Sequence, residues 1–240
     1  TIEPHIGIVE LPDIRLKNLA KIYCPEKITP ATVEFIDIAG LVKGASKGEG
    51  LGNQFLGQIR QTSAILHVVR CFDDKNITHV DGSIDPVRDV ETIETELLLA
   101  DILTIEKRKH KVEKLARSGD KEAKSYLYVL DLLLEHCSNG NAARLLEVDD
   151  EYNRFKRSLH LLTEKPVLYI ANTSEAEAME GNTGEYVKSL EGYASEENNV
   201  VISLCSSIEQ EIALLREEER PIFLQEYGLS EPGLNKVIRS

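Results

Sequence analysis

The chain has 240 residues, 42% of them hydrophobic and 29% charged, a composition that excludes a disordered or fibrous protein and suits one large domain or two modest ones. The net charge of −13 excludes general nucleic-acid binding by bulk electrostatics and leaves only local basic patches. The four cysteines form no CxxC pair, which favours free thiols in a reducing cytosol over a zinc site or a disulfide framework.

Five short apolar runs rich in β-branched residues predict β-strands, at residues 5–10, 32–37, 64–71, 166–171 and 200–205. The last three runs are almost continuously apolar, as expected for parallel strands that are covered on both faces. Helical patterns, such as those at residues 52–61 and 183–195, lie between several of the strands. This alternation predicts an α/β fold with three layers.

Residues 85–163 interrupt the alternation with a long helical stretch. No Gly or Pro occurs at residues 89–117, and apolar residues recur there at helical spacing. The sequence SGD at 118–120 is a helix stop followed by a cap, and a second apolar stripe predicts a helix at 121–137. A third helical piece near residues 149–162 leads back to the sheet. We therefore expect a helical hairpin inserted into the α/β domain.

The motif DIAG, from Asp37 to Gly40, ends the second predicted strand and continues beyond it. A carboxylate there, followed by a tight turn, fits the second phosphate-site motif of P-loop nucleotidases. Asp37 can hold a water of Mg²⁺, and the amide of Gly40 can approach a γ-phosphate. Four glycines between residues 44 and 52 indicate a ligand-responsive switch. Alone, DxxG also fits an ordinary strand-to-loop turn.

A second motif, from Asn172 to Glu175, directly follows the fourth predicted strand, at the edge where open α/β sheets bind ligands. GTPases carry Asn-Lys-x-Asp there, and its Asp accepts two donors of the guanine edge. In this chain Thr173 replaces the Lys and Glu175 replaces the Asp. The longer carboxylate shifts the acceptor, which makes adenine an alternative to guanine. Ser206 and Ser207, after the last strand, are expected in a loop that closes over the base.

Four segments together resemble the Obg-like ATPase (YchF) family over essentially the whole chain: DIAGLVKGASKGEGLGN at 37–53, HVVRCF at 67–72, the NxxE variant at 172–175 and EPGLNKVIR at 231–239. The resemblance implies a P-loop nucleotidase domain, a helical hairpin insertion and a C-terminal TGS domain. It also implies hydrolysis of ATP in preference to GTP, and association with ribosomes.

The resemblance carries roles over to individual residues. Thr1 matches a switch threonine that can reach Mg²⁺, Asp37 matches the metal-water carboxylate, and Gly40 matches the γ-phosphate amide. Asn172 and Glu175 match the base-recognition motif, which makes them cofactor-binding residues together with Ser206 and Ser207.

A catalytic role is implied for one histidine. Leu41 stands where many relatives carry a water-orienting glutamine, and a leucine cannot hydrogen-bond to the attacking water. His79, in the polar loop at residues 73–82, matches a histidine to which the family assigns this role. His67, inside a predicted strand, is expected instead to be a packed or hydrogen-bonded core residue.

One family motif does not occur: there is no G-x-x-x-x-G-K-[ST] phosphate loop in the sequence. In the family, that loop and its central strand precede the segment that begins at Thr1, and the TGS domain follows Arg239. We therefore expect an internal fragment whose sheet lacks its first strand. The expected parts are residues 1–84 and 164–240 of the nucleotidase domain and the hairpin insertion at 85–163.

Eight Lys and Arg residues lie within residues 107–124, around the expected tip of the hairpin. Most such charge runs are solvated helix faces. A projecting basic tip is nevertheless a reasonable contact for the phosphates of ribosomal RNA or tRNA.

The leading hypothesis is a cytoplasmic, Mg²⁺-dependent ATPase that couples hydrolysis to binding of the ribosome, most simply through its large subunit. In this hypothesis ATP is the substrate and GTP binds more weakly. Two alternatives remain: a non-catalytic RNA- or protein-binding module built on the hairpin, and a GTPase of related fold.

Overall fold

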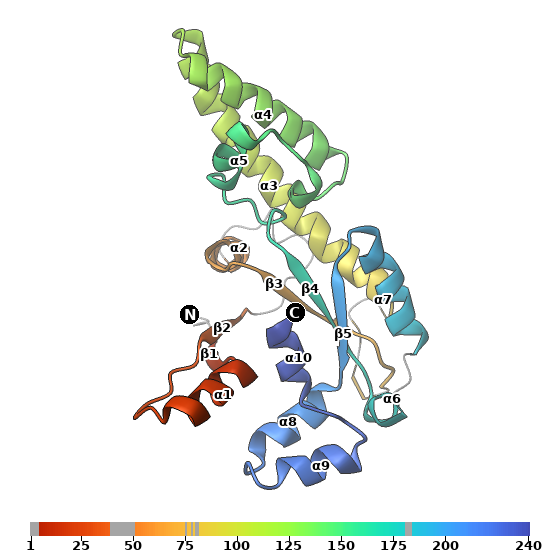
Figure 1. The fold of residues 1–240 in the computed structure, drawn as a ribbon. Helices are drawn as coiled ribbons and strands as arrows, with labels where there is room; N and C mark the ends of the chain where they lie inside the picture. The colour runs from red at the N-terminus through yellow and green to blue at the C-terminus, as the bar shows by residue number, and fades with distance from the viewer. Residues whose placement is uncertain (1–4, 39–50, 75, 78, 80–81, 181–183) are drawn as a thin grey trace.

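The structure is a computed structural model that describes residues 5–38, 51–74, 76–77, 79, 82–180 and 184–240 (Figure 1). Its strands are β1 (His5–Glu10), β2 (Thr32–Asp37), β3 (Ile65–Arg70), β4 (Val167–Asn172) and β5 (Val200–Leu204). Its helices are α1 (Ile14–Tyr23), α2 (Leu51–Gln61), α3 (Pro86–Arg117), α4 (Lys121–Ser138), the 3-10 helix η2 (Ala143–Leu145), α5 (Asp150–Arg157), α6 (Glu175–Glu180), α7 (Glu185–Glu196), α8 (Ser206–Leu214), α9 (Arg220–Glu226) and α10 (Gly233–Arg239). None of these helices has the length and apolar character needed to cross a membrane.

All five predicted strands are confirmed to within one residue at each end, and they form two sheets. Strands β1 and β2 pair antiparallel, with His5 opposite Asp37. Strands β3, β4 and β5 form a parallel sheet in that order, with Ile65 opposite Val167 in the first pair. No ladder between described residues joins β2 to β3.

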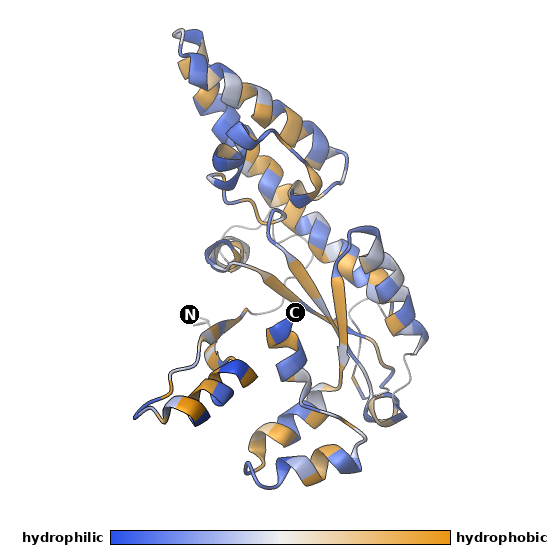
Figure 2. Cartoon of the chain, viewed as in Figure 1, coloured by the Kyte–Doolittle hydropathy of each residue, from blue (hydrophilic) through white to orange (hydrophobic). Residues whose placement is uncertain are grey.

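The central strand of the parallel sheet is covered on both faces, as its continuous apolar run predicts (Figure 2). On one face, Tyr169 of β4 packs in a cluster with Val90 of α3 and Leu190 of α7. On the other face, Ile170 of β4 packs with Val237 of α10. Each fully buried aliphatic side chain of this kind contributes about 1.5–3 kcal/mol, so these two clusters hold the helices against the sheet.

Helices α3 and α4 form an antiparallel hairpin that projects from the sheet (Figure 1). The predicted stop between them is confirmed: Gly119 has a φ of +95°, which an L side chain rarely adopts. Asp120 then begins α4 by accepting a hydrogen bond from the backbone N–H of Ala123 at 3.1 Å. Along the hairpin, Ile105 and Leu130 are completely buried in one apolar cluster.

The third helical piece is shorter than predicted. Helix α5 ends at Arg157, whereas the apolar pattern predicts helix up to residue 162. His160 has a φ of +51°, in the left-handed region, which cannot continue a right-handed helix. The apolar residues that follow, Leu161 and Leu162, are buried without being helical.

The carboxylate of Asp101, fully buried on α3, anchors the chain where it returns from the hairpin. Its Oδ1 accepts from the backbone N–H of Leu162 at 2.7 Å, and its Oδ2 accepts from the N–H and hydroxyl of Thr163 at 2.7 and 2.8 Å. Burial raises the pKa of this carboxyl group, against the opposing effect of the three donors. The Thr163 hydroxyl also accepts from the N–H of Ala143, so both ends of the connector at 143–163 are tied to α3.

Arg144 of η2 provides a second, charged link between the hairpin and the sheet. Its guanidinium donates to Glu94 of α3 at 2.6 Å and to Glu197, which follows α7, at 3.0 Å. The hydroxyl of Tyr193 on α7 donates to the same Glu94 at 2.8 Å. The three charged side chains are largely buried, so the pairs are shielded from water.

Replacing Asp101 tests this anchor. Asp101→Ala leaves two N–H groups and one hydroxyl buried without their acceptor, and each such group costs about 1–3 kcal/mol. We expect the free energy of unfolding, measured with denaturant, to fall by about 3 kcal/mol or more. Asp131→Ala, which removes a half-exposed partner of Lys109 from the same hairpin, is the control and changes stability little. Equal losses in the two variants would contradict the anchoring role.

Candidate functional site

Asn172, the last residue of β4, fixes the start of α8 against the carboxyl end of the parallel sheet. Its Oδ1 accepts a hydrogen bond from the backbone N–H of Ser206 at 2.9 Å. The neighbouring Thr173 is buried, and its backbone N–H donates to the carbonyl of Leu204 at 2.9 Å. The chain segments that follow β4 and β5 are therefore joined side by side.

Glu175, the first residue of α6, makes a second link at the same place. Its Oε1 accepts from the hydroxyl of Ser207 at 2.8 Å. The Ser207 oxygen also lies 3.1 Å from the Sγ of Cys205, a buried residue to which sequence reasoning gave no role. The structure thus brings together Asn172, Glu175, Ser206 and Ser207, and we call this set the base cluster.

The base cluster offers both acceptors and donors to a planar ligand. The side chain of Glu175 and the loop at Ser206 and Ser207 are exposed, so these groups are accessible from solvent. A carboxylate accepts hydrogen bonds only, whereas hydroxyl groups both donate and accept. Such a set can recognise the exocyclic amino groups and ring nitrogens of a purine.

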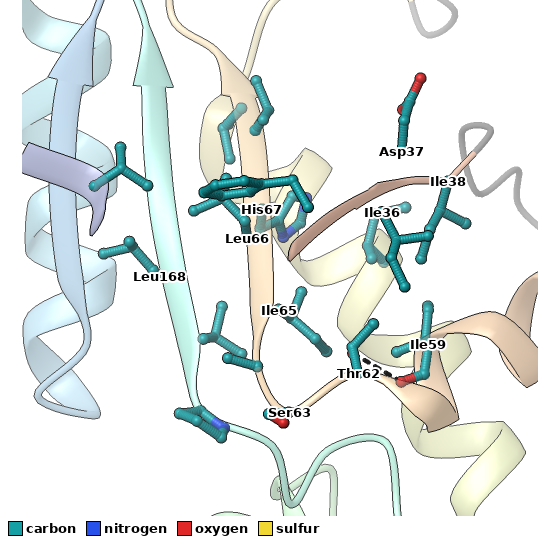
Figure 3. Close-up of a pocket in the computed structure, with 18 of the residues that line it drawn as sticks. Ile36, Asp37, Ile38, Ile59, Thr62, Ser63, Ile65, Leu66, His67 and Leu168 are labelled. Atoms are coloured by element: carbon teal, nitrogen blue, oxygen red, sulfur yellow. Dashed lines mark hydrogen bonds between the residues drawn. The ribbon is translucent and has the colours of Figure 1, made fainter. Parts of the chain in front are cut away.

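A wide cleft of about 1980 Å³ separates the antiparallel pair from the parallel sheet. Its walls carry apolar strand side chains that are open to solvent, including Ile6 of β1 at 60% exposure and Val68 of β3 at 57%. Figure 3 shows Leu66 of β3 and Ile36 of β2 among the lining side chains. Apolar strand faces are normally buried in a soluble α/β protein, so these walls have the character of a sheet interior.

Asp37 lies at the rim of this cleft, at the carboxyl end of β2. Because side chains alternate along a strand, it points away from Ile36 and Ile38, as Figure 3 shows. Its carboxylate is exposed and suits a hard cation such as Mg²⁺. The other two residues predicted near the metal and the γ-phosphate, Thr1 and Gly40, lie outside the described residues.

His79 lines the same cleft and contacts a residue that sequence reasoning missed. Its Nε2 lies 2.9 Å from Oδ2 of Asp89, in the first turn of α3. The structure thus places His79 and Asp37 on one cleft, although 42 residues separate them in the sequence. No spacing rule points to Asp89, because its partner is ten residues away in a loop.

Arg70, the last residue of β3, holds the loop that leads to His79. Its guanidinium donates to the backbone carbonyls of Phe72 at 3.1 Å, Asp74 at 3.3 Å and Ile77 at 3.1 Å. It also lies over the ring of Phe72. The fixed fork of a guanidinium suits several acceptors at once, so Arg70 ties this loop to the sheet edge.

His67 lies on β3, with its ring centroid 5.8 Å from that of Tyr169. This placement confirms the prediction of a packed residue, although the ring also lines the cleft (Figure 3). Burial lowers the pKa of His67 from its ordinary value of 6.5 to about 4, while Glu94 and Asp89 act in the opposite direction. His67 is therefore neutral near pH 7.

This shift predicts a pH dependence of stability. Between pH 6.5 and about 4 the unfolded chain binds a proton at His67 that the folded chain resists, so the free energy of unfolding falls as the pH falls. We expect His67→Phe, which keeps a ring beside Tyr169, to remove about 2 kcal/mol of the loss between pH 7 and pH 4.5. Denaturant unfolding of both proteins at several pH values measures this difference. Parallel stability curves would contradict it.

Comparisons with known proteins agree with this geometry. A family model described as 50S ribosome-binding GTPase matches residues 16–95. Over all 240 residues the chain is 50% identical to the ribosome-binding ATPase YchF of Bacillus subtilis and 51% identical to that of Escherichia coli O157:H7. It spans 66% and 65% of the lengths of these two relatives.

A solved structure of the Schizosaccharomyces pombe YchF GTPase superposes with a TM-score of 0.86 at 32% identity, and the match covers all of this chain and 65% of that one. The likeness therefore extends over both sheets and the hairpin rather than one motif. On these sequence and structural matches, the chain belongs to the YchF family.

Proposed function

We propose that this chain forms most of the nucleotide-binding part of a ribosome-associated ATPase. The base cluster carries the proposal, because four side chains that sequence reasoning assigned to one base site meet at the carboxyl ends of β4 and β5. Relatives about 50% identical are named ribosome-binding ATPases.

ATP is preferred over GTP in this proposal. The carboxylate of Glu175 is one methylene longer than the Asp of the guanine motif, and it is already hydrogen-bonded to Ser207. It is therefore poorly placed to accept the two donors of the guanine edge, whereas the hydroxyl and backbone groups around it suit adenine. Weaker binding of GTP follows.

The phosphates and Mg²⁺ are assigned to the cleft. Mg²⁺ usually takes one or two carboxylates together with waters and substrate phosphates, so the exposed Asp37 fits as a ligand through water. No group of three or more metal-binding side chains occurs among the described residues, which is consistent with such a shared site. Thr1 and Gly40 are proposed to complete it. Mg²⁺ would supply charge neutralisation of the phosphates.

The open apolar walls of the cleft favour a further strand between β2 and β3. In this proposal the strand and its phosphate-binding loop come from a part of the protein outside these 240 residues, and they complete a three-layer P-loop nucleotidase sheet. Residues 1–84 and 164–240 then form that domain, residues 85–163 form the hairpin insertion, and a TGS domain follows.

Hydrolysis proceeds by in-line attack of water on the γ-phosphate, with the protein positioning the groups. His79 orients this water, since Leu41 cannot hydrogen-bond to it. Asp37 fixes the metal water on the opposite wall of the cleft.

A histidine variant of the full-length protein tests this function. His79→Ala removes the water-orienting group, so we expect ATP turnover to fall about 100-fold while the affinity for a non-hydrolysable ATP analogue stays within about twofold. His110→Ala, an exposed histidine of the hairpin, is the control and keeps wild-type turnover. Unchanged turnover in His79→Ala would contradict the role of His79. Tighter binding of GTP than of ATP would favour the GTPase alternative.

The hairpin tip is proposed to contact the ribosome, through phosphates of ribosomal RNA or tRNA, in the cytoplasm. Of the eight basic residues at 107–124, seven are exposed, and Lys109 is paired with Asp131 at 2.7 Å. The stretch carries three acidic residues, so its net charge is 8 − 3 = +5 in a chain of −13. Local charge of this sign attracts phosphate even on an acidic protein.

Charge neutralisation tests the tip. The quadruple variant replaces Lys107, Lys111, Lys114 and Lys121 with Gln, and its control replaces Lys17, Lys21, Lys27 and Lys188. We expect the tip variant alone to lose about tenfold or more in ribosome affinity, measured by co-sedimentation, with the slope against log salt reduced by about 1 per lost phosphate contact. Equal losses in both variants would exclude a local contact. Binding that persists without nucleotide and depends on the tip would favour the non-catalytic module.

A further inference from the structure

The contact between His79 and Asp89 joins a loop to the start of the longest helix of the chain. Nε2 of His79 lies 2.9 Å from Oδ2 of Asp89, a short distance for a hydrogen bond of this type. The two side chains are 16% and 22% exposed, so water competes little for the contact. Both residues line the cleft that also holds Asp37.

The chemistry of this pair decides which nitrogen of His79 carries a proton. An ionised carboxylate only accepts hydrogen bonds, so Nε2 must be the donor. The neutral imidazole then has its lone pair on Nδ1. Only this nitrogen can accept a hydrogen bond from a water molecule, so the carboxylate determines which edge of the ring can act on water.

Asp89 is itself held in place by its surroundings. Its backbone N–H donates to the carbonyl of Asp85, the N-cap residue of α3, at 3.0 Å. Its Oδ1 accepts from Arg88 at 3.2 Å, and Arg88 also donates to the backbone carbonyl and hydroxyl of Ser83. The first turn of a helix favours a negative charge, because the N–H groups there point toward it.

We propose that Asp89 is the positioning residue of His79: it holds the imidazole in the Nε2–H form and turns Nδ1 toward the attacking water. The inference rests on the water-orienting role proposed for His79. Asp89 does not touch nucleotide in this arrangement. It acts through the histidine, as carboxylates that bind the second nitrogen of a functional histidine commonly do.

The tautomer can be observed directly in the full-length protein without any substrate. Histidine-selective ¹⁵N spectroscopy is expected to show His79 protonated on Nε2, with a downfield proton signal that His79→Ala removes. Asp89→Ala should lose this downfield signal while the signals of the other histidines remain. Protonation of His79 on Nδ1, or survival of the signal in Asp89→Ala, would overturn the proposal.

Kinetics separate positioning from a structural role. Asp89→Asn is expected to lower kcat for ATP at least about tenfold with KM within about twofold, and Asp89→Glu to regain part of the loss. Because Asp89 acts through the histidine, the double variant with His79→Ala should be no slower than His79→Ala alone. Asp85→Asn is the matched control: Asn caps a helix as well as Asp does, so this variant keeps wild-type kcat.

The outcomes distinguish this inference from the function on which it rests. Additive losses in the double variant, or a raised KM with unchanged kcat in Asp89→Asn, would overturn the role of Asp89 and leave the ATPase intact. Absence of ATP hydrolysis by the wild-type protein would instead overturn the proposed function, and the positioning role with it.

Discussion

The buried carboxylate of Asp101 is the interaction on which the arrangement of the two halves depends. It accepts three hydrogen bonds from Leu162 and Thr163, which lie just before β4 begins at Val167. A 61-residue excursion through the hairpin thus returns to a fixed point on α3. Since β4 is the middle strand of the parallel sheet, the position of the sheet relative to α3 follows from this contact.

Helix α3 then links two regions that lie far apart in the molecule. Asp89, in its first turn, contacts His79 at the cleft, and its last turns carry the basic residues of the tip. Asp101 and the pairing of Arg144 with Glu94 hold its middle against the sheet domain. A continuous helix of 32 residues held in this way moves as a unit, so a displacement at the tip is transmitted to Asp89. In a ribosome-associated ATPase, this geometry would couple binding to hydrolysis.

Elements with a strong local signal could be predicted from the sequence. The strands follow from their β-branched runs, and the hairpin follows from uninterrupted helical spacing and a Gly stop at residue 119. Helix α1 was missed because it buries none of its residues, and α5 was extended too far because nothing in its pattern shows the positive φ of His160. The base cluster was predictable because both of its loops follow strands. Asp89, Arg70 and Asp101 were not, because their partners are defined only by tertiary contacts.

The two parts of the candidate site differ in how they are held. The base cluster is closed by hydrogen bonds among its own residues at the end of a packed sheet, so its geometry needs no other element. Asp37 and His79 instead stand on opposite walls of a cleft whose apolar lining is open. Their separation is therefore set by whatever fills the cleft, and burying those strand faces would stabilise the closed arrangement by about 25 cal/mol per Å². Base recognition can thus be pre-formed, whereas the phosphate side is completed only when the sheet is complete.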